Sequence, residues 1–311
     1  MKLDLKKIKI FAHWADSNTI FNKVMNEYDW ESDNKYGIDY IFTKDNDFTH
    51  AILIDLAMPN ISINKENIIG LAQEPATHFH FESRVINSKD KFINYCKNNV
   101  KKYFIGSTKS FKLIPSVPFI EKMSYQLPYM SYKIVNNFIE HYPEKNGLIN
   151  YVYSWKNPGY PTHLYHYRHK LGNHIFKNKL PIDIYGSVTN SLKKNFPNKE
   201  NIKYAFDWKD VHKVYENYKF SIVIENVREP EYISEKIMIP LLCGSNPIYL
   251  GSTNIDNYFK DYVIHLSGNI EKDIHTIKNI IDNPDKYYKK INIKEIKEKI
   301  HLKNIIHQEF L

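Results

Sequence analysis

Apolar residues along this chain gather in short runs of strand length, and patterns of helical period lie between many of them. The runs of the first half are almost continuously apolar rather than alternating, which is typical of strands buried on both faces. They cover residues 7–14, 38–42, 50–56, 66–72 and 103–106, with helices expected at 21–28 and 83–99. Residues 113–130 carry Pro and aromatic residues and predict an irregular segment.

The second half repeats this alternation of strands and helices. Strands are predicted at residues 147–154, 182–187, 219–225, 246–251 and 261–266. Helices are predicted at residues 162–177, 207–218 and 234–243, followed by two Lys-rich amphipathic helices over residues 270–282 and 284–308. Asp207 stands at the start of one of these helices, where its side chain can cap free backbone N–H groups.

Two successive series of strands and helices predict two parallel sheets with helices on both faces, which is an α/β fold of two Rossmann-like domains. The segment EHYPEKNG at residues 140–147 is polar and holds both Pro and Gly, so we expect the joint there. The domains are therefore assigned to residues 1–143 and 144–311. Because ligands of such sheets bind beyond the carboxyl ends of the strands, two domains facing each other would form a cleft.

Composition narrows the class of protein. Hydrophobic residues make up 42% of the 311 residues and charged residues 25%, which is a globular composition. Two cysteines cannot build a disulfide framework, and no apolar run reaches the roughly 18 residues that a membrane span needs. The N-terminal sequence is too polar for a signal peptide. We therefore expect a soluble, cytoplasmic protein.

The chain is basic, with a formal net charge of +8, and such a surface can serve nucleic acid, an anionic membrane or a phosphate-bearing substrate. No nucleic-acid-binding motif is present, so we expect no nucleic-acid partner. The Lys-rich C-terminal helices leave open a peripheral contact with a membrane surface. Only three of the 43 basic residues are arginines, the better bidentate phosphate ligand. They are Arg84, Arg168 and Arg228.

The fourteen histidines do not predict a metal site. His163, His166 and His169 lie at i, i+3 and i+6 in HLYHYRH and do not form a motif of the HExxH type. An aromatic, basic helix with imidazoles at its surface accounts for them better. We therefore expect neither a metal ion nor a cofactor.

The stretch ENVREPEYISEK, residues 225–236, places polar side chains between a buried strand and a helix that starts at once. Ser234 can cap that helix, which puts Glu235 and Lys236 in its first turn. The N–H groups and positive dipole end there suit an anion, and Lys236 adds a full charge. A nucleoside diphosphate fits this set, with the Glu235 carboxylate for ribose and Tyr232 for a sugar ring or phosphate. A capped helix with solvated charges is the alternative.

The region from this strand to Phe259 resembles the signature of the α1,3-fucosyltransferases of glycosyltransferase family 10. In that signature an aromatic strand leads to Glu-Asn. A Tyr, a hydroxyl residue and Glu-Lys follow at fixed spacing before an apolar helix, a Pro, a Gly and a late Phe. The matching residues are Glu225, Asn226, Tyr232, Ser234, Glu235, Lys236, Pro247, Gly251 and Phe259.

The resemblance implies a GT-B fold whose C-terminal domain holds most of the donor, GDP-fucose. It also implies an inverting, metal-independent transfer of fucose to a hydroxyl, with O3 expected, of an oligosaccharide or glycoconjugate acceptor. Carried onto this chain, it assigns donor binding to Tyr232, Glu235 and Lys236, with Asn226 nearby.

An inverting transfer needs a base that takes the proton from the acceptor hydroxyl. Glu74 follows an apolar strand in GLAQEPATHF. The pair Glu74-Pro75 resembles the Glu, followed closely by Pro, that serves as catalytic base in the family. We therefore predict Glu74 as the base, with His78 and His80 as chemically able alternatives.

A cation beside the phosphates stabilises the leaving GDP, and family members usually supply an Arg after a Ser-Asn-Pro-like strand end. This chain keeps Ser154 and Asn157 but shows Thr162 and His163 at the expected place, with Arg168 five residues later. On a helix, five residues leave Arg168 about 140° away from that position. The candidates for the cation are therefore Arg228, His163, Lys156 and Arg168.

This departure from the family pattern weakens the assignment of fucose as the donor sugar. One alternative is a GT-B transferase that uses another nucleotide sugar, such as GDP-mannose or a UDP-sugar. The other is a protein that binds a nucleotide or a carbohydrate without catalysis.

Overall fold

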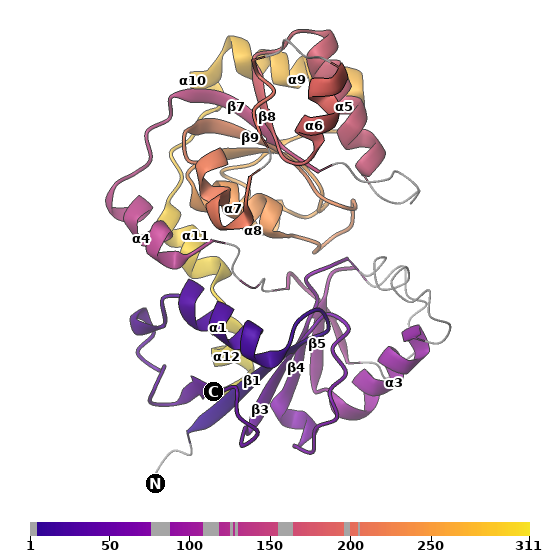
Figure 1. The fold of residues 1–311 in the computed structure, drawn as a ribbon, viewed down its shortest axis with the longest axis vertical. Coiled ribbons are helices and arrows are strands. Elements are labelled where there is room, and N and C mark those ends of the chain that lie inside the picture. The colour runs from indigo at the N-terminus through magenta and orange to yellow at the C-terminus, as the bar shows by residue number, and fades with distance from the viewer. Residues whose placement is uncertain are drawn as a thin grey trace. The chain divides into compact units, whose positions relative to one another are not determined.

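The computed structural model describes residues 5–75, 88–107, 118–124, 127, 130–154, 164–195, 200–204 and 206–311. The chain divides into two compact units, each an α/β structure on one parallel sheet (Figure 1). Unit 1 comprises Met1–Lys133, Glu229–Ser234 and Lys299–Leu311, and unit 2 comprises Ile134–Arg228 and Glu235–Glu298. The predicted α/β fold of two Rossmann-like domains is confirmed.

The sheet of unit 1 has six parallel strands in the order β2-β1-β3-β4-β5-β6. They are β1 (Lys6–Ala12), β2 (Tyr40–Phe42), β3 (His50–Ile54), β4 (Ile68–Leu71), β5 (Lys102–Ile105) and β6 (Phe119–Glu121). Every residue of β3 and β4 is buried, as expected for central strands of a parallel sheet. The segment predicted to be irregular contains β6, a three-residue edge strand too short to show a period.

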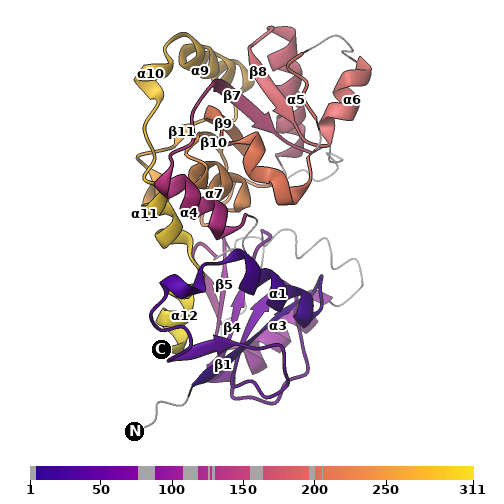
Figure 2. The same ribbon diagram turned by 60° about the vertical axis from the view of Figure 1, so that its left-hand side comes forward.

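Helices cover both faces of this sheet (Figure 2). Helix α3 (Ser88–Asn99) packs Phe92 into a cluster with Leu53 of β3. Helix α12 (Lys303–Phe310) lies on the opposite face, where the Phe310 and His50 rings are 4.8 Å apart. His50 and Leu53 mark the two faces because successive side chains of a strand alternate. The other helices in the described part of unit 1 are α1 (Ser17–Glu27) and two short 3-10 helices, Trp30–Ser32 and Lys65–Asn67.

The C-terminal residues belong to unit 1, although the sequence analysis placed them in the second domain. On α12, the buried Glu309 carboxylate lies 2.9 Å from Lys102 Nζ. His307 Nε2 lies 2.8 Å from the Asp33 carboxylate. A buried carboxylate is costly without such a partner, so these pairs fix where α12 lies on the sheet.

The helix predicted over residues 284–308 is wrong as one element. The chain instead forms α10 (Pro284–Tyr287), α11 (Ile293–Ile300) and α12. Pro284 stands in the first turn of α10, where its missing N–H is tolerated. Asn292 starts α11, because its side-chain oxygen accepts the Glu295 N–H at 3.2 Å.

The sheet of unit 2 has five parallel strands in the order β11-β10-β9-β7-β8. They are β7 (Gly147–Val152), β8 (Ile182–Tyr185), β9 (Tyr218–Ile224), β10 (Asn246–Leu250) and β11 (Ile264–His265), so all five predicted strands are present. The core holds Tyr151, Phe220 and Ile248 from three of these strands.

The helices that accompany this sheet follow the predicted alternation. Within the described ranges they are α4 (Tyr132–Glu140), α5 (Tyr165–Lys177), α6 (Val188–Asn195), α7 (Glu235–Leu242), α8 (Asp256–Phe259), α9 (Ile270–Asp282), α10 and α11. The predicted α-helix at 207–218 is a shorter 3-10 helix, Trp208–Val214, because the chain must enter β9 at Tyr218. Asp207 caps it as predicted, accepting the Lys209 N–H at 3.2 Å.

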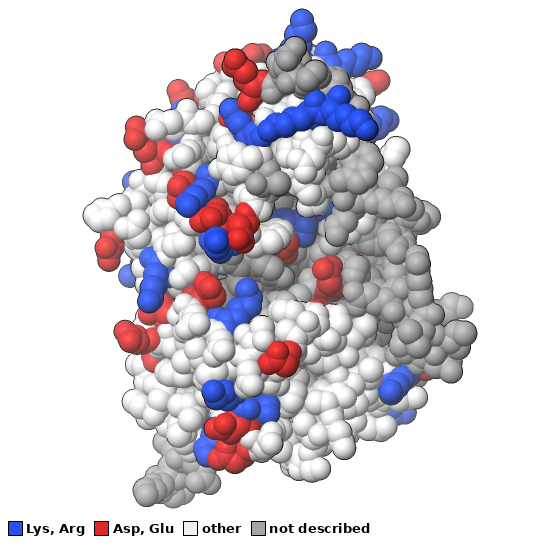
Figure 3. All heavy atoms as spheres, viewed as in Figure 1, with Lys and Arg blue, Asp and Glu red and all other residues white. Residues whose placement is uncertain are grey.

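Acidic and basic side chains are interspersed over the face of the molecule seen in Figure 3. Such mixing is typical of a solvated protein surface. None of the helices in the described ranges is long and apolar enough to cross a membrane.

Candidate functional site

The carboxyl end of β9 presents the Glu-Asn pair of the signature. β9 ends at Ile224, and Glu225 and Asn226 follow it as buried residues. The Glu225 N–H still donates to the Leu250 carbonyl of β10 at 2.9 Å, so the pair lies where the sheet ladder ends. This edge of a parallel sheet is where ligands bind.

Arg168 of α5 holds this strand end from inside unit 2. Its Nε and Nη2 donate to the Ile224 carbonyl at 3.1 and 2.6 Å, and Nη2 also donates to Asn226 Oδ1 at 2.9 Å. The residue is only 5% exposed. These contacts make Arg168 a support of Asn226, and its direct contact with phosphate stays a prediction.

Arg228, two residues beyond Asn226, is exposed. Its Nη1 donates to the Ser267 carbonyl at 3.0 Å, which is its one hydrogen bond to the described residues. The buried Asp273 of α9 holds that loop, because its carboxylate accepts the N–H groups of Ser267 and Gly268 at 2.7 and 2.9 Å. Arg228 therefore extends from an ordered loop with its charge open to solvent.

Helix α7 begins directly after Ser234, so Glu235 and Lys236 occupy its first turn as predicted. Lys236 Nζ lies 2.8 Å from Glu235 Oε1, and the two side chains are 26% and 16% exposed. The rest of the helix is buried and anchors this turn in unit 2. A carboxylate and an ammonium group thus stand together at a helix N-terminus, where N–H groups and the dipole favour an anion.

Close packing beside Glu225 explains the Gly of the signature. A Cβ built on Gly251 would lie 2.4 Å from both Glu225 Cγ and Tyr249 Oη. The Tyr249 hydroxyl accepts the Ser252 N–H at 2.8 Å. Burial, and then the nearby Glu225 carboxylate, raise the pKa of this hydroxyl well above its usual value. Only glycine leaves room for the Glu225 side chain.

In unit 1, the carboxyl end of β4 presents Gln73 and the predicted base, Glu74. Both backbone N–H groups donate to Asp55 Oδ1, at 2.7 and 3.2 Å. Glu74 is partly exposed, whereas Gln73 is buried. At the end of the neighbouring strand β5, the Ser107 N–H donates to the Pro230 carbonyl at 3.1 Å. Glu74 therefore lies at the end of β4, and the part of the signature around Pro230 lies at the end of the adjacent strand β5.

Tyr232 lies in Glu229–Ser234, the signature segment that belongs to unit 1. It is 4% exposed, and its backbone is so close to Gly106 that a Cβ there would lie 3.3 Å from Tyr232 N. In the same segment, Glu231 Oε2 accepts the Met123 N–H at 3.0 Å. The segment is thus anchored beyond β5 and β6, and donor contact by Tyr232 stays a prediction.

Sequence reasoning missed two buried polar groups in unit 1. Burial raises the pKa of the Glu229 carboxyl, and its Oε2 has no hydrogen-bond partner within the described ranges. The buried Gln73 Nε2 has none either. Such atoms are rare in proteins and often mark functional positions. In the sequence, the position of Gln73 next to the predicted base Glu74 was the one feature that could have marked it as a candidate site residue.

Several predicted residues lie outside the described residues, namely His163, Lys156, His78 and His80. Among the residues that the structure does describe, no group of three or more His, Cys, Asp or Glu side chains could hold a metal ion. The described part of the chain therefore contains no preformed metal centre.

Comparison with protein families decides the classification. The family model described as "Glycosyltransferase family 10 (fucosyltransferase) C-term" matches residues 143–303, just over half of the chain. This chain belongs to glycosyltransferase family 10. The matched region contains β9 and α7, so the resemblance inferred from the signature is confirmed.

Curated relatives of this family 10 chain carry fucosyltransferase names. "GDP-fucose protein O-fucosyltransferase 3" of Xenopus tropicalis is 29% identical over 112 residues, covering 35% of this chain and 23% of the relative. "Alpha-(1,3)-fucosyltransferase B" of Drosophila melanogaster is 39% identical over 85 residues, covering 25% and 18%. The chain therefore matches less than a quarter of the length of either relative.

Solved structures support the two-domain fold of this family 10 chain. The crystal structure of an α1,3-fucosyltransferase with GDP has a TM-score of 0.51 at 16% identity, covering 97% of this chain and 90% of that one. An α-glucosyltransferase in complex with UDP and a 13-mer DNA has a TM-score of 0.56 at 10% identity, covering 95% and 93%. At these identities the likeness concerns the GT-B fold alone.

Proposed function

We propose that this chain transfers fucose from GDP-fucose, with inversion and without a metal ion, to a hydroxyl of an acceptor sugar, O3 being favoured. The observation that carries the proposal is the signature itself. It places Asn226 and Arg228 beyond β9 and Glu235 and Lys236 in the first turn of α7. Membership of family 10 and the names of the fucosyltransferase relatives support the same donor.

The donor would be held mainly by unit 2. The α7 N-terminus offers N–H groups to the diphosphate, and Lys236 neutralises its charge. The Glu235 carboxylate accepts hydrogen bonds from ribose hydroxyls, and Asn226 and Tyr232 line the donor. Arg228 is the second cation that the exposed position favours, with His163 as the alternative.

Glu74 would act as general base. As the acceptor oxygen forms its bond to the anomeric carbon, the bond from that carbon to the β-phosphate oxygen breaks. The hydroxyl proton moves to the Glu74 carboxylate, and GDP leaves with the electron pair of the broken bond. Removing such a base typically lowers the rate about 10²–10⁴-fold.

The test combines a donor panel with three variants. Thermal shift and donor turnover are measured with GDP-fucose, GDP-mannose and UDP-sugars, with and without EDTA, against sugar acceptors and Ser- or Thr-containing peptides. GDP-fucose is expected to be the preferred donor, with activity unchanged by EDTA. Glu74→Gln should keep GDP binding and lose transfer. Lys236→Ala should weaken both, and Lys213→Ala, an exposed lysine of unit 2, should change neither.

Three outcomes would contradict parts of the proposal. Preference for a UDP-sugar would contradict the proposed donor, GDP-fucose. Transfer to peptides rather than to sugars would contradict the proposed acceptor. GDP binding without turnover of any donor would favour a binding protein that does not catalyse.

A further inference from the structure

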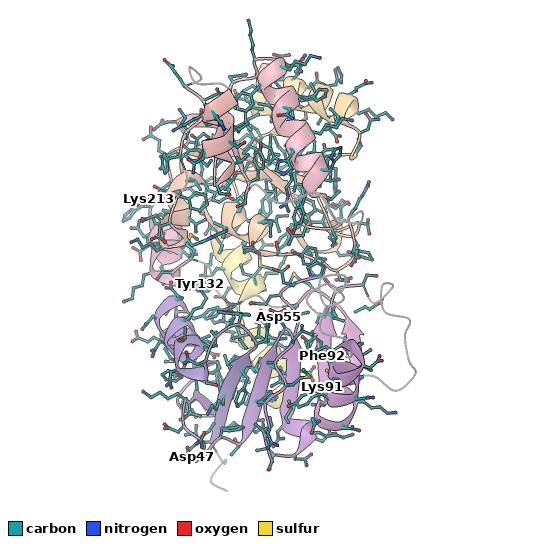
Figure 4. All side chains as sticks on the ribbon, turned by 45° about the vertical axis from the view of Figure 1, so that its right-hand side comes forward. Asp47, Asp55, Lys91, Phe92, Tyr132 and Lys213 are labelled. Atoms are coloured by element: carbon teal, nitrogen blue, oxygen red, sulfur yellow. The ribbon has the colours of Figure 1, made fainter. Side chains whose placement is uncertain are left out.

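The carboxyl edge of the unit 1 sheet contains a buried carboxylate that the mechanism does not use. Asp55 follows β3 directly and is 2% exposed. Figure 4 labels it at the ends of the unit 1 strands. Its φ of 53° lies in the left-handed region, which costs a non-glycine residue some free energy, although Asp tolerates it better than most. A strained, buried charge needs a reason at this position.

The hydrogen bonds of Asp55 show what it organises. Its N–H donates to the Leu71 carbonyl at 3.0 Å, and its carbonyl accepts the Tyr103 hydroxyl at 2.7 Å. Its side-chain Oδ1 accepts the N–H groups of Gln73 and Glu74. Asp55 thus ties together β3, β4 and β5 at the point where their ladder ends.

The two side-chain bonds act on the turn that carries Glu74. The Ala72 N–H, one residue beyond β4, still bonds across the sheet to the Phe104 carbonyl at 2.9 Å. The next two N–H groups, those of Gln73 and Glu74, do not pair with a neighbouring strand. Both donate to the same carboxylate oxygen, Asp55 Oδ1. Successive N–H groups that converge on an anion form a rigid cradle, and charged hydrogen bonds of this kind are the strong ones.

We propose that Asp55 is a positioning residue that fixes Glu74 for proton abstraction by holding the backbone of residues 73–74. The inference rests on the proposed role of Glu74 as base. A general base must lie within hydrogen-bond reach of the proton it takes, so a released turn lowers the rate without changing the chemistry of the carboxylate.

The experiment compares Asp55→Gly, which accepts a positive φ but removes the carboxylate, with Asp55→Asn, which keeps a side-chain oxygen to accept both N–H groups. Asp47→Ala is the matched control, because Asp47 is exposed at the opposite end of the same sheet (Figure 4). At saturating donor and acceptor, kcat of Asp55→Gly should fall at least tenfold, but by no more than the roughly 10²–10⁴-fold that the base itself contributes. Asp55→Asn should keep most activity, and Asp47→Ala all of it.

Two further readouts separate positioning from general damage. In a Glu74→Gln background, measured at high enzyme concentration, Asp55→Gly should change the residual kcat less than twofold, since Asp55 acts through Glu74. Amide hydrogen exchange at residues 73 and 74 should become faster in Asp55→Gly but not in Asp55→Asn or Asp47→Ala. The affinity of Asp55→Gly for GDP should equal that of the parent.

Full activity of a folded Asp55→Gly protein would overturn the positioning role while leaving Glu74 as base. Full activity of Glu74→Gln would remove the base itself. If Asp55→Gly does not fold, Asp55→Asn decides, because a folded but inactive Asn variant would show that accepting the two N–H groups is not what Asp55 supplies.

Discussion

The same substitution at the two arginines near the end of β9, Arg168 and Arg228, should affect two different properties of the protein. Arg168 is buried and donates to the Ile224 carbonyl and Asn226 Oδ1. Arg228 is exposed and, among the described residues, donates to the Ser267 carbonyl alone. Replacing each by Met keeps most of the side-chain length and removes the guanidinium. Arg168→Met is expected to cost stability, and Arg228→Met to cost GDP affinity.

The magnitudes follow from the hydrogen bonds. Arg168→Met leaves two buried acceptors without their donor, and each costs about 1–3 kcal/mol of unfolding free energy. Taking roughly 3 kcal/mol for both, Tm should fall by about 6–12 °C for a domain of this size class. Arg228→Met should stay within about 0.5 kcal/mol of the parent, as exposed substitutions usually do. A charged hydrogen bond to phosphate is worth about 1.5–3 kcal/mol, so Kd for GDP should rise about 10–100-fold.

The assay is urea unfolding and thermal unfolding of the three proteins, together with calorimetric titration of GDP. Each variant serves as the control for the other, because both lose one guanidinium in the same region of unit 2. GDP binding by Arg168→Met is measured below its own unfolding transition, so that lost affinity is not confused with unfolding.

An Arg168→Met protein as stable as the parent, yet at least tenfold weaker for GDP, would refute this reasoning. That result would mean that the Arg168 guanidinium reaches the diphosphate when the donor binds. Unchanged GDP affinity in Arg228→Met would remove Arg228 from the donor site and favour His163 as the second cation.

Three further predictions concern the same strand ends. Gly251→Ala should lower the unfolding free energy by about 1–3 kcal/mol, because the new methyl group meets Glu225 and Tyr249, and urea unfolding measures this. Burial raises the pKa of Glu229, so its contribution to stability falls as pH rises past the ordinary value of 4.5. Glu229→Gln should therefore raise Tm at pH 7 relative to the parent, and this advantage should vanish at about pH 4. Gln73→Met should keep or raise Tm, because a buried donor without a partner costs about 1–3 kcal/mol, and a lower Tm would mean that Nε2 is satisfied.

The central strands were predictable because each is short and almost entirely buried, as β3, β4 and β10 are. The run KFSIVIE predicted β9 and placed Glu225 at its end, and the structure agrees. Parallel sheets require such continuous apolar runs, so the periodic signal and the buried environment have one cause. The first turn of α7 was predictable for a similar reason, since a hydroxyl residue before an apolar run is typical of a helix start.

The hydrogen bonds of Arg168 were not predictable from the sequence. Its principal acceptor is a backbone carbonyl, which any residue at position 224 would provide, so no residue type marks the contact. The helical angle from the expected position showed only that Arg168 was a poor substitute for the missing family Arg. It could not show that the guanidinium faces the strand end.

The division of the signature between the units was also hidden. Residues 225–236 read as one loop between a strand and a helix, but Glu229–Ser234 belongs to unit 1 and α7 to unit 2. The contacts that decide this, such as Ser107 N–H to the Pro230 carbonyl, join residues more than a hundred positions apart. Local periodicity carries no information about pairs at that separation.

Each unit fixes the end of a central strand with one buried charged side chain that bonds to backbone. In unit 2 the Arg168 cation takes a carbonyl at the end of β9, and in unit 1 the Asp55 anion takes two N–H groups beyond β4. The two side chains carry opposite charges because they bond to different backbone groups: a carbonyl at the end of β9 and two N–H groups beyond β4. A charge that bonds to a neutral backbone stiffens the turn without neutralising the candidate residue beside it. The backbone on which Asn226 and Glu74 stand is therefore held by hydrogen bonds from a neighbouring charged side chain, which is how a rigid support positions a site residue.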